Sequence, residues 1–347
     1  MAYSPILKPN ALMNPKTYTG NGGTQSITGV GFKPDMTWLK KRNGTANHHL
    51  VDAVRGVGYY IYPNLSNAQG GNGATLLTSF NSDGFTLDAG ADSNASGATG
   101  VGWSWKAGNL ANGQGSANTA GSINSTVSVN TTAGFSIVKY TGTGSLATVG
   151  HGLGVAPSWI ITKVLTTTHD WAVYHQGLGN TSAVYLNLQN DKSDSSAWWN
   201  NTSPTSNVFT INTRNEVNQG SQNYISYCFA QKQGYSKFGT YTGNNNADGT
   251  FVYTGFKPAW VMVFAYTAGN ENWMLVDNKR DGYNVENEQL FPNTNDDEES
   301  NNEVDLVSNG FKLRRANTRM NGAIPYIYMA FAEEPLVASN YNVATAR

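Results

Sequence analysis

The residues best suited to chemistry in this sequence are its five histidines and a few carboxylates. His48 and His49 are adjacent, and adjacent residues of a strand point to opposite faces, so they are poorly placed to share a metal ion. The glycine-rich stretch around His151 resembles a phosphate-binding loop, but no helical pattern follows it, and we interpret it as a turn. The sequence therefore predicts no metal site and no cofactor.

The carboxylates form one run and one separated pair. Asp296 to Glu299, with Glu303, could offer oxygen ligands to calcium, but they do not follow the EF-hand pattern, and such runs are usually solvated loops. The sequence leaves calcium binding at 296–303 open. Asp52 and Asp277 occupy equivalent positions of an internal repeat, which favours a structural role such as an ion pair with Arg55 or Arg280. We predict that the protein is not an enzyme.

Aromatic residues outside the repeat pattern are the remaining functional signal. Tyr59, Tyr60 and Tyr62 precede a glycine-rich loop, and Trp198 and Trp199 lie in a polar stretch. Aromatic faces beside Asn and Gln suit stacking and hydrogen bonding to sugar rings. The hypothesis is that these five residues bind a ligand, and the alternative is that they cover a core edge or a subunit interface.

The composition restricts the class of protein. Charged residues make up 13% of the chain and the net charge is −1, so no basic field is present to attract nucleic acid. No apolar run approaches the length of a membrane span, and the N-terminus lacks the pattern of a signal peptide. Tyr, Trp, Val and Thr favour strands, and the 38 glycines and many asparagines favour turns. We therefore predict an all-β protein with little helix.

Two short motifs occur three times in the same order. A Tyr-Thr-Gly triplet is followed 13 or 14 residues later by a glycine, a proline turn and a tryptophan-bearing strand. Such constant spacing indicates one structural unit used three times. The triplets begin at Tyr18, Tyr140 and Tyr241, and Trp105, Phe229 and Phe331 close the three units at equivalent positions.

The repeat predicts three tandem antiparallel β-sandwich modules of jelly-roll-like type. The expected boundaries are an N-terminal docking arm (1–16), module 1 (17–108), a Gly/Ser/Asn-rich linker (109–133), module 2 (134–233), module 3 (234–335) and a C-terminal tail (336–347). Residues 123–129 of the linker could form one edge strand.

The repeated motifs resemble those of a repeat family of virion structural proteins from tailed bacteriophages, many with marine and cyanobacterial hosts. The resemblance rests on Tyr-Thr-Gly-Asn-Gly, Gly-Phe-Lys-Pro-Asp, the segments 79–87 and 103–108, and the segment 230–239. It covers residues 17 to about 335, and the second copy has diverged most. Members look like tail, tail-fibre or other surface proteins of the particle, and the family implies no catalytic residues.

The resemblance implies a virion protein made in the host cytoplasm without a signal peptide. We expect a homo-oligomeric tail fibre or appendage that binds the host surface or its glycans and contacts other virion proteins through the N-terminal arm. Two alternatives stay open, a capsid-decorating or other purely structural virion protein, and a glycan depolymerase. We expect neither nucleic acid nor membrane insertion.

Overall fold

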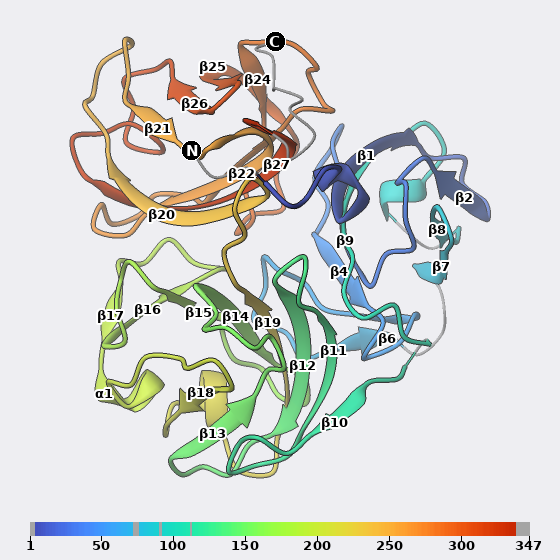
Figure 1. Ribbon diagram of the computed structural model, residues 1–347. Helices are drawn as coiled ribbons and strands as arrows, with labels where there is room; N and C mark the ends of the chain where they lie inside the picture. The colour runs from blue at the N-terminus through green and yellow to red at the C-terminus, as the bar shows by residue number, and fades with distance from the viewer. Residues whose placement is uncertain (1–3, 72–75, 90–91, 112, 338–347) are drawn as a thin grey trace.

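The computed structural model describes residues 4–71, 76–89, 92–111 and 113–337, and these are built almost entirely from antiparallel strands (Figure 1). The prediction of an all-β chain with little helix is confirmed. Within the described residues the helical elements are one turn long: η1 (Pro9–Ala11), η2 (Asp92–Asn94), α1 (Ser196–Trp199) and α2 (Asn215–Asn218). Figure 1 shows three β bodies, one per module, grouped around a common centre.

Module 1 has a four-stranded sheet in the order β1-β9-β3-β4 and a smaller sheet in the order β2-β8-β7. Apolar residues of both sheets, including Leu39 and Phe85, form a core between them. The strands are β1 (Met13–Thr19), β2 (Gln25–Thr28), β3 (Met36–Lys41), β4 (His49–Asp52), β7 (Leu77–Asn81), β8 (Gly84–Leu87) and β9 (Thr99–Trp105), with a separate pair β5 (Tyr59–Tyr60) and β6 (Gly70–Gly71).

Module 2 contains the same four-strand order, β12-β19-β14-β15, extended on both sides into eight strands, and a second sheet of β13 and β18. The core between the two sheets includes Val149 and Ile160. The strands are β10 (Ser116–Asn118), β11 (Ser125–Asn130), β12 (Phe135–Thr141), β13 (Ala147–Gly150), β14 (Trp159–Val164), β15 (Ala172–His175), β16 (Ser182–Tyr185), β17 (Ser193–Asp194), β18 (Val208–Ile211) and β19 (Asn223–Phe229).

Module 3 repeats the order once more, with β20-β27-β22-β23 in one sheet and β21-β26-β25-β24 in the other. Val263 and Phe311 belong to the core that these sheets share. The strands are β20 (Ser236–Thr242), β21 (Phe251–Tyr253), β22 (Phe256–Ala265), β23 (Met274–Asp277), β24 (Glu286–Gln289), β25 (Glu299–Val307), β26 (Gly310–Leu313) and β27 (Pro325–Pro335).

Two segments outside the predicted modules are integral parts of these sheets. The predicted linker 109–133 contributes β10 and β11, and β11 pairs with β12 along its whole length. In the predicted arm, Ile6 is buried, Ser4 donates its backbone N–H to the carbonyl of Val337, and β1 begins at Met13. Residues 4–16 are therefore not a free docking arm, because their apolar side chains and backbone groups are already used. Residues 1–3 and 338–347 lie outside the described part of the chain.

The three modules also share a central core. In each module, the sheet that contains the shared four-strand order packs one face on the second sheet of its module and the other face on the neighbouring modules. All residues of β14 and β22, and all but one of β3, are therefore buried. The aromatics that close the modules meet here: the ring centroids of Trp105 and Phe331 lie 5.8 Å apart, as do those of Phe229 and Phe331. The chain is thus one body with four cores.

Equivalent hydrogen bonds join the modules in a cycle. The residue before β4, β15 or β23 has a ring nitrogen within hydrogen-bond distance of a backbone carbonyl of another module, and in all three cases that residue also donates its backbone N–H to an asparagine side chain. The ring contacts are Trp171 Nε1 to Tyr62 O (2.9 Å), Trp273 Nε1 to Tyr185 O (2.8 Å) and His48 Nε2 to Phe291 O (3.0 Å), and the asparagines are Asn187, Asn293 and Asn64 respectively. Module 1 thus contacts module 3, module 2 contacts module 1, and module 3 contacts module 2.

Lysine ammonium groups are buried in two of the interfaces. Lys163 of β14 donates to the carbonyls of Ser66, Val164 and His169, and Lys40 of β3 donates to that of Asn295. Both side chains are almost fully buried. Burial therefore lowers the pKa of Lys163 to about 7 and that of Lys40 to about 8, although nearby carboxylates act in the opposite direction.

These lysines predict that stability rises with pH in the alkaline range. Between the native pKa of Lys163, about 7, and its ordinary value of 10.5, the unfolded chain binds more protons than the native chain. The free energy of unfolding should therefore increase across this window, and Lys40 adds to the increase above about pH 8. Denaturant unfolding at several pH values measures the slope. Lys163→Met should flatten it, whereas Lys139→Met, at an exposed lysine, should leave it unchanged.

Candidate functional site

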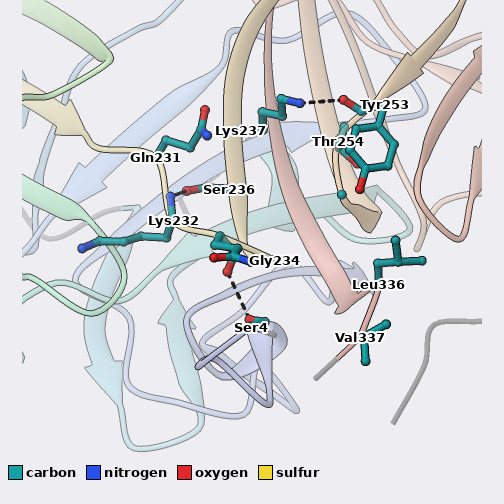
Figure 2. A pocket seen from close by; sticks show the side chains of 12 residues that line it. Ser4, Gln231, Lys232, Gly234, Ser236, Lys237, Tyr253, Thr254, Leu336 and Val337 are labelled. Carbon is teal, nitrogen blue, oxygen red and sulfur yellow. Dashed lines mark hydrogen bonds between the residues drawn. The ribbon is translucent and has the colours of Figure 1, made fainter. Parts of the chain in front are cut away.

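A cleft of about 400 Å³ lies at the start of module 3. Its walls are the connection from module 2 (231–234), the first residues of β20, the end of β21 and the last described residues, 336 and 337. Figure 2 shows Lys237 reaching across the cleft to Tyr253, whereas the side chain of Lys232 extends away from it. The lining is mostly polar, with one aromatic ring.

Two exposed aromatic residues lie on β21, and one of them, Tyr253, lines this cleft. Phe251 and Tyr253 are 44% and 49% exposed, while Val252 between them is buried in the core of module 3. The alternation follows from the period of a strand, which places residues i and i+2 on one face. We call Phe251 and Tyr253 the aromatic rim.

The aromatic rim is specific to module 3. Val252 pairs with Phe311, as Ile27 pairs with Phe85 in module 1 and Val149 with Phe209 in module 2, which fixes the equivalence of β21, β2 and β13. The residues flanking these pairs are Ser26 and Thr28 in module 1 and Thr148 and Gly150 in module 2. The shared fold therefore does not require aromatic residues there.

Lys237 organises the inner edge of the rim. Its ammonium donates to the carbonyl of Tyr253 at 2.8 Å and lies 5.2 Å from the centroid of the Tyr253 ring, a cation–π distance. Partial burial lowers the pKa of Lys237. The hydrogen bond uses one of three ammonium donors, so the cleft presents a cation beside an aromatic face. Such a pair can bind a ring with hydroxyl or carboxylate substituents.

The predicted tyrosine site is only half exposed. Tyr60, Tyr62 and His49 pack against one another with ring centroids 5.1 to 5.2 Å apart. A methyl group at Gly70 would lie 2.6 Å from the Tyr60 ring, so the β6 backbone covers one face of that ring. Tyr59, on β5, is also half-buried. Much of the ring surface in this cluster is therefore already used for packing.

Trp198 and Trp199 are buried, which contradicts the hypothesis that they bind a ligand. Helix α1 begins after Ser195, whose hydroxyl accepts from the Ala197 N–H, and it turns both indoles into the core of module 2. The Trp199 N–H donates to the carbonyl of Ser182, and Trp198 stacks under Arg214, 4.6 Å from the guanidinium carbon. Neither ring is available for stacking with a ligand.

One carboxylate of the acidic run and one histidine make contacts between modules, Glu298 with Arg42 and His48 with the carbonyl of Phe291. Glu298 binds Arg42 of module 1 and Arg280 of module 3; burial opposes its ionisation, but the two guanidinium groups outweigh burial and lower the pKa of Glu298 to about 2. Glu303 pairs with Arg315. His48 is completely buried, and burial lowers its pKa well below the usual value. In the described part of the chain no group of three metal-ligating side chains is close enough to hold an ion.

The fold and the rim define an all-β protein of three fused modules with an aromatic-rimmed cleft on the third. The chain belongs to the family described as domain of unknown function DUF7483, whose model matches residues 8–335. Searches of curated proteins and of solved structures find no match. Among the described residues, no helix is sufficiently long and apolar to cross a membrane.

Proposed function

We propose that the protein is a surface protein of a tailed-phage virion and that it binds host-surface glycans through the aromatic rim. The observation that carries the binding proposal is the exposure of Phe251 and Tyr253 on one face of an edge strand. Stacking of a sugar ring on each aromatic face would contribute about 1 kcal/mol. The resemblance of the repeated motifs to virion proteins supports the proposed location.

We propose binding without cleavage. Glycoside hydrolysis needs an acid and a base or nucleophile at a fixed separation beside the substrate. Asp52 and Asp277 are buried, belong to different modules and are each paired with an arginine. Glu298 is likewise held between two arginines. These pairings support a structural role for all three carboxylates.

The predicted affinity of one site is weak, and several copies of the protein on one particle would supply avidity. Host envelope polysaccharide, immobilised and titrated with the purified protein, measures single-site binding. Phe251→Ala or Tyr253→Ala should each weaken binding about fivefold, the equivalent of about 1 kcal/mol. Tyr283→Ala is the matched control, because Tyr283 is 80% exposed but lies outside β21.

Three results would contradict this proposal. Equal binding by the two rim variants and the parent protein would exclude the aromatic rim as the sugar site. New reducing ends on the polysaccharide, lost on mutating one carboxylate, would favour a depolymerase. Absence of both binding and cleavage would favour a purely structural virion protein.

A further inference from the structure

The first strand of every module carries one residue whose side chain bridges the two sheets of that module. The three residues are equivalent, because each pairs with the residue just before the aromatic that closes its module. Each side chain donates to a backbone carbonyl at the end of β2, β13 or β21, or just beyond it. The bonds run from Asn14 Nδ2 to Val30 O (2.9 Å), from Ser136 Oγ to His151 O (2.6 Å) and from Lys237 Nζ to Tyr253 O (2.8 Å).

The fold requires a hydrogen-bond donor at this position but not a positive charge. A neutral amide makes the contact in module 1, and a neutral hydroxyl makes it in module 2. An ammonium group loses hydration when it is half-buried, as Lys237 is, so the lysine is the more costly way to make the same bond. The bond to Tyr253 occupies one of its three donors and leaves two for a ligand.

The cleft around Lys237 contains no carboxylate that could balance this charge. Its described lining includes two lysines but neither Asp nor Glu, and the segment that follows in the sequence, 338–347, has no acidic side chain either. The recess at the equivalent place of module 1, about 540 Å³ in volume, is different: it is lined by Asn14, Glu333, Glu334 and one lysine, Lys8. A cation without a carboxylate beside it is therefore particular to the cleft of module 3.

The number of cations in the cleft indicates the charge of the group that it can bind. Figure 2 shows the ammonium of Lys237 beside Tyr253, whereas the side chain of Lys232 extends away from the cleft. Phosphate sites commonly use the fork of an arginine, and no arginine is among the described residues that line this cleft. A single ammonium with two remaining donors matches the two oxygens of one carboxylate.

We propose that the cleft selects acidic sugars, with the carboxylate of a uronic acid on the Lys237 ammonium and the sugar ring beside Tyr253. This inference rests on the proposed function and names the class of glycan that the site prefers. The aromatic rim supplies contact area for any sugar, and Lys237 supplies the discrimination between an acidic sugar and its neutral counterpart.

The probe is the host envelope polysaccharide before and after chemical reduction of its carboxyl groups, which converts each uronic acid into the corresponding neutral sugar. The full-length protein should bind the native polymer about three- to tenfold more tightly than the reduced one, because only the native polymer offers an anion to the ammonium. The preference should shrink as the salt concentration rises, since ions screen partly exposed charges.

Three variants assign this preference to Lys237. Lys237→Asn introduces the residue of module 1, which retains a donor for the Tyr253 carbonyl, and it should abolish the preference, whereas Lys237→Arg should preserve it. Lys8→Asn is the matched control, because Lys8 is an exposed lysine in the recess of module 1, and it should leave the ratio of the two affinities unchanged. Phe251→Ala should weaken binding of both polymers by the same factor, which separates the preference from sugar binding itself.

Three outcomes would count against the acidic-sugar assignment. Equal binding of the native and reduced polymers, with both weakened by Phe251→Ala, would retain the proposed sugar site but remove its selectivity. A preference that persists in Lys237→Asn would place the carboxylate elsewhere. Stronger competition by glucose 6-phosphate than by glucuronate would assign the site to phosphate. Binding of neither polymer would instead contradict the proposed function together with this inference.

Discussion

Replacing Asp52 with alanine is expected to lower the free energy of unfolding by about 3–5 kcal/mol, because it leaves a buried arginine without its counter-ion. The Arg55 guanidinium is completely buried; burial opposes its charge, but the Asp52 carboxylate outweighs burial and raises the pKa of Arg55. Asp52 also accepts from the Tyr227 hydroxyl of module 2 at 2.7 Å. Denaturant unfolding of the full chain measures the loss.

Two variants make this prediction specific. Asp277→Ala should cost less than Asp52→Ala, because Arg280 keeps Glu298 as a second partner, although the bond from Trp103 Nε1 to Asp277 is lost. The double change Asp52→His with Arg55→Leu introduces the residues that module 2 carries at these two positions. The positions correspond because His175 pairs with Trp159 in module 2 as Asp52 pairs with Met36 in module 1. This double variant should lose less free energy of unfolding than Asp52→Ala does. Equal losses for all three variants would mean that the uncompensated charge is not the cause.

Deletion of residues 1–16 is expected to abolish soluble, folded protein. The deletion removes Met13 to Lys16 from β1, and with them half of its ladder to β9. It also removes Ile6 and Met13 from the central core. Burial of two such side chains contributes about 1.5–3 kcal/mol each, and the lost ladder adds to this, against a typical total stability of about 5–15 kcal/mol.

Expression in soluble form, circular dichroism and limited proteolysis test this prediction. Ile6→Ala in the full-length chain is the graded control, and it should fold with a loss of about 2–4 kcal/mol. A truncated chain that stays folded and melts like the parent would contradict the integral role of residues 4–16.

The local structure could be predicted from the sequence because its signals are local. The strands could be predicted from period-two alternation, proline turns and the threefold motif. The structure also explains the tyrosine of the Tyr-Thr-Gly motif. Tyr140 stacks on Tyr224 and donates to the Val217 carbonyl, and Tyr241 does the same with Tyr326 and Met320. Each of these contacts lies within one module, where the repeat itself specifies the fold.

The packing between modules could not be predicted, because it depends on which sheet faces meet. One signal was present: Trp260 to Phe264 is apolar without alternation, as in a strand covered on both faces. In β3 and β14 the buried lysines Lys40 and Lys163 interrupt that pattern, because each donates to at least one backbone carbonyl of another module. The linker's apolar signal was weak, since β11 buries only small residues and valines. It indicated a strand at 123–129, but not that β10 would follow β11 at the edge of the sheet.

The candidate site was missed for a similar reason. Trp198 and Trp199 lie in a polar stretch, which suggested exposure, but one capped helical turn directs both rings inward. Phe251 and Tyr253 could have been found by comparing the three copies, since the matching residues in modules 1 and 2 are Ser, Thr or Gly. The alternation Phe-Val-Tyr on an edge strand was the available signal.

Covalent fusion of the three modules has a consequence for stoichiometry. A ring of three identical subunits would display every surface feature three times, and each mutation would alter all three copies at once. Here one gene encodes the whole ring, so the aromatic rim at Phe251 and Tyr253 can occur once while the other two modules keep different surfaces. Each molecule can therefore be monovalent despite its threefold plan, and the number of molecules on a particle sets the number of contacts it makes.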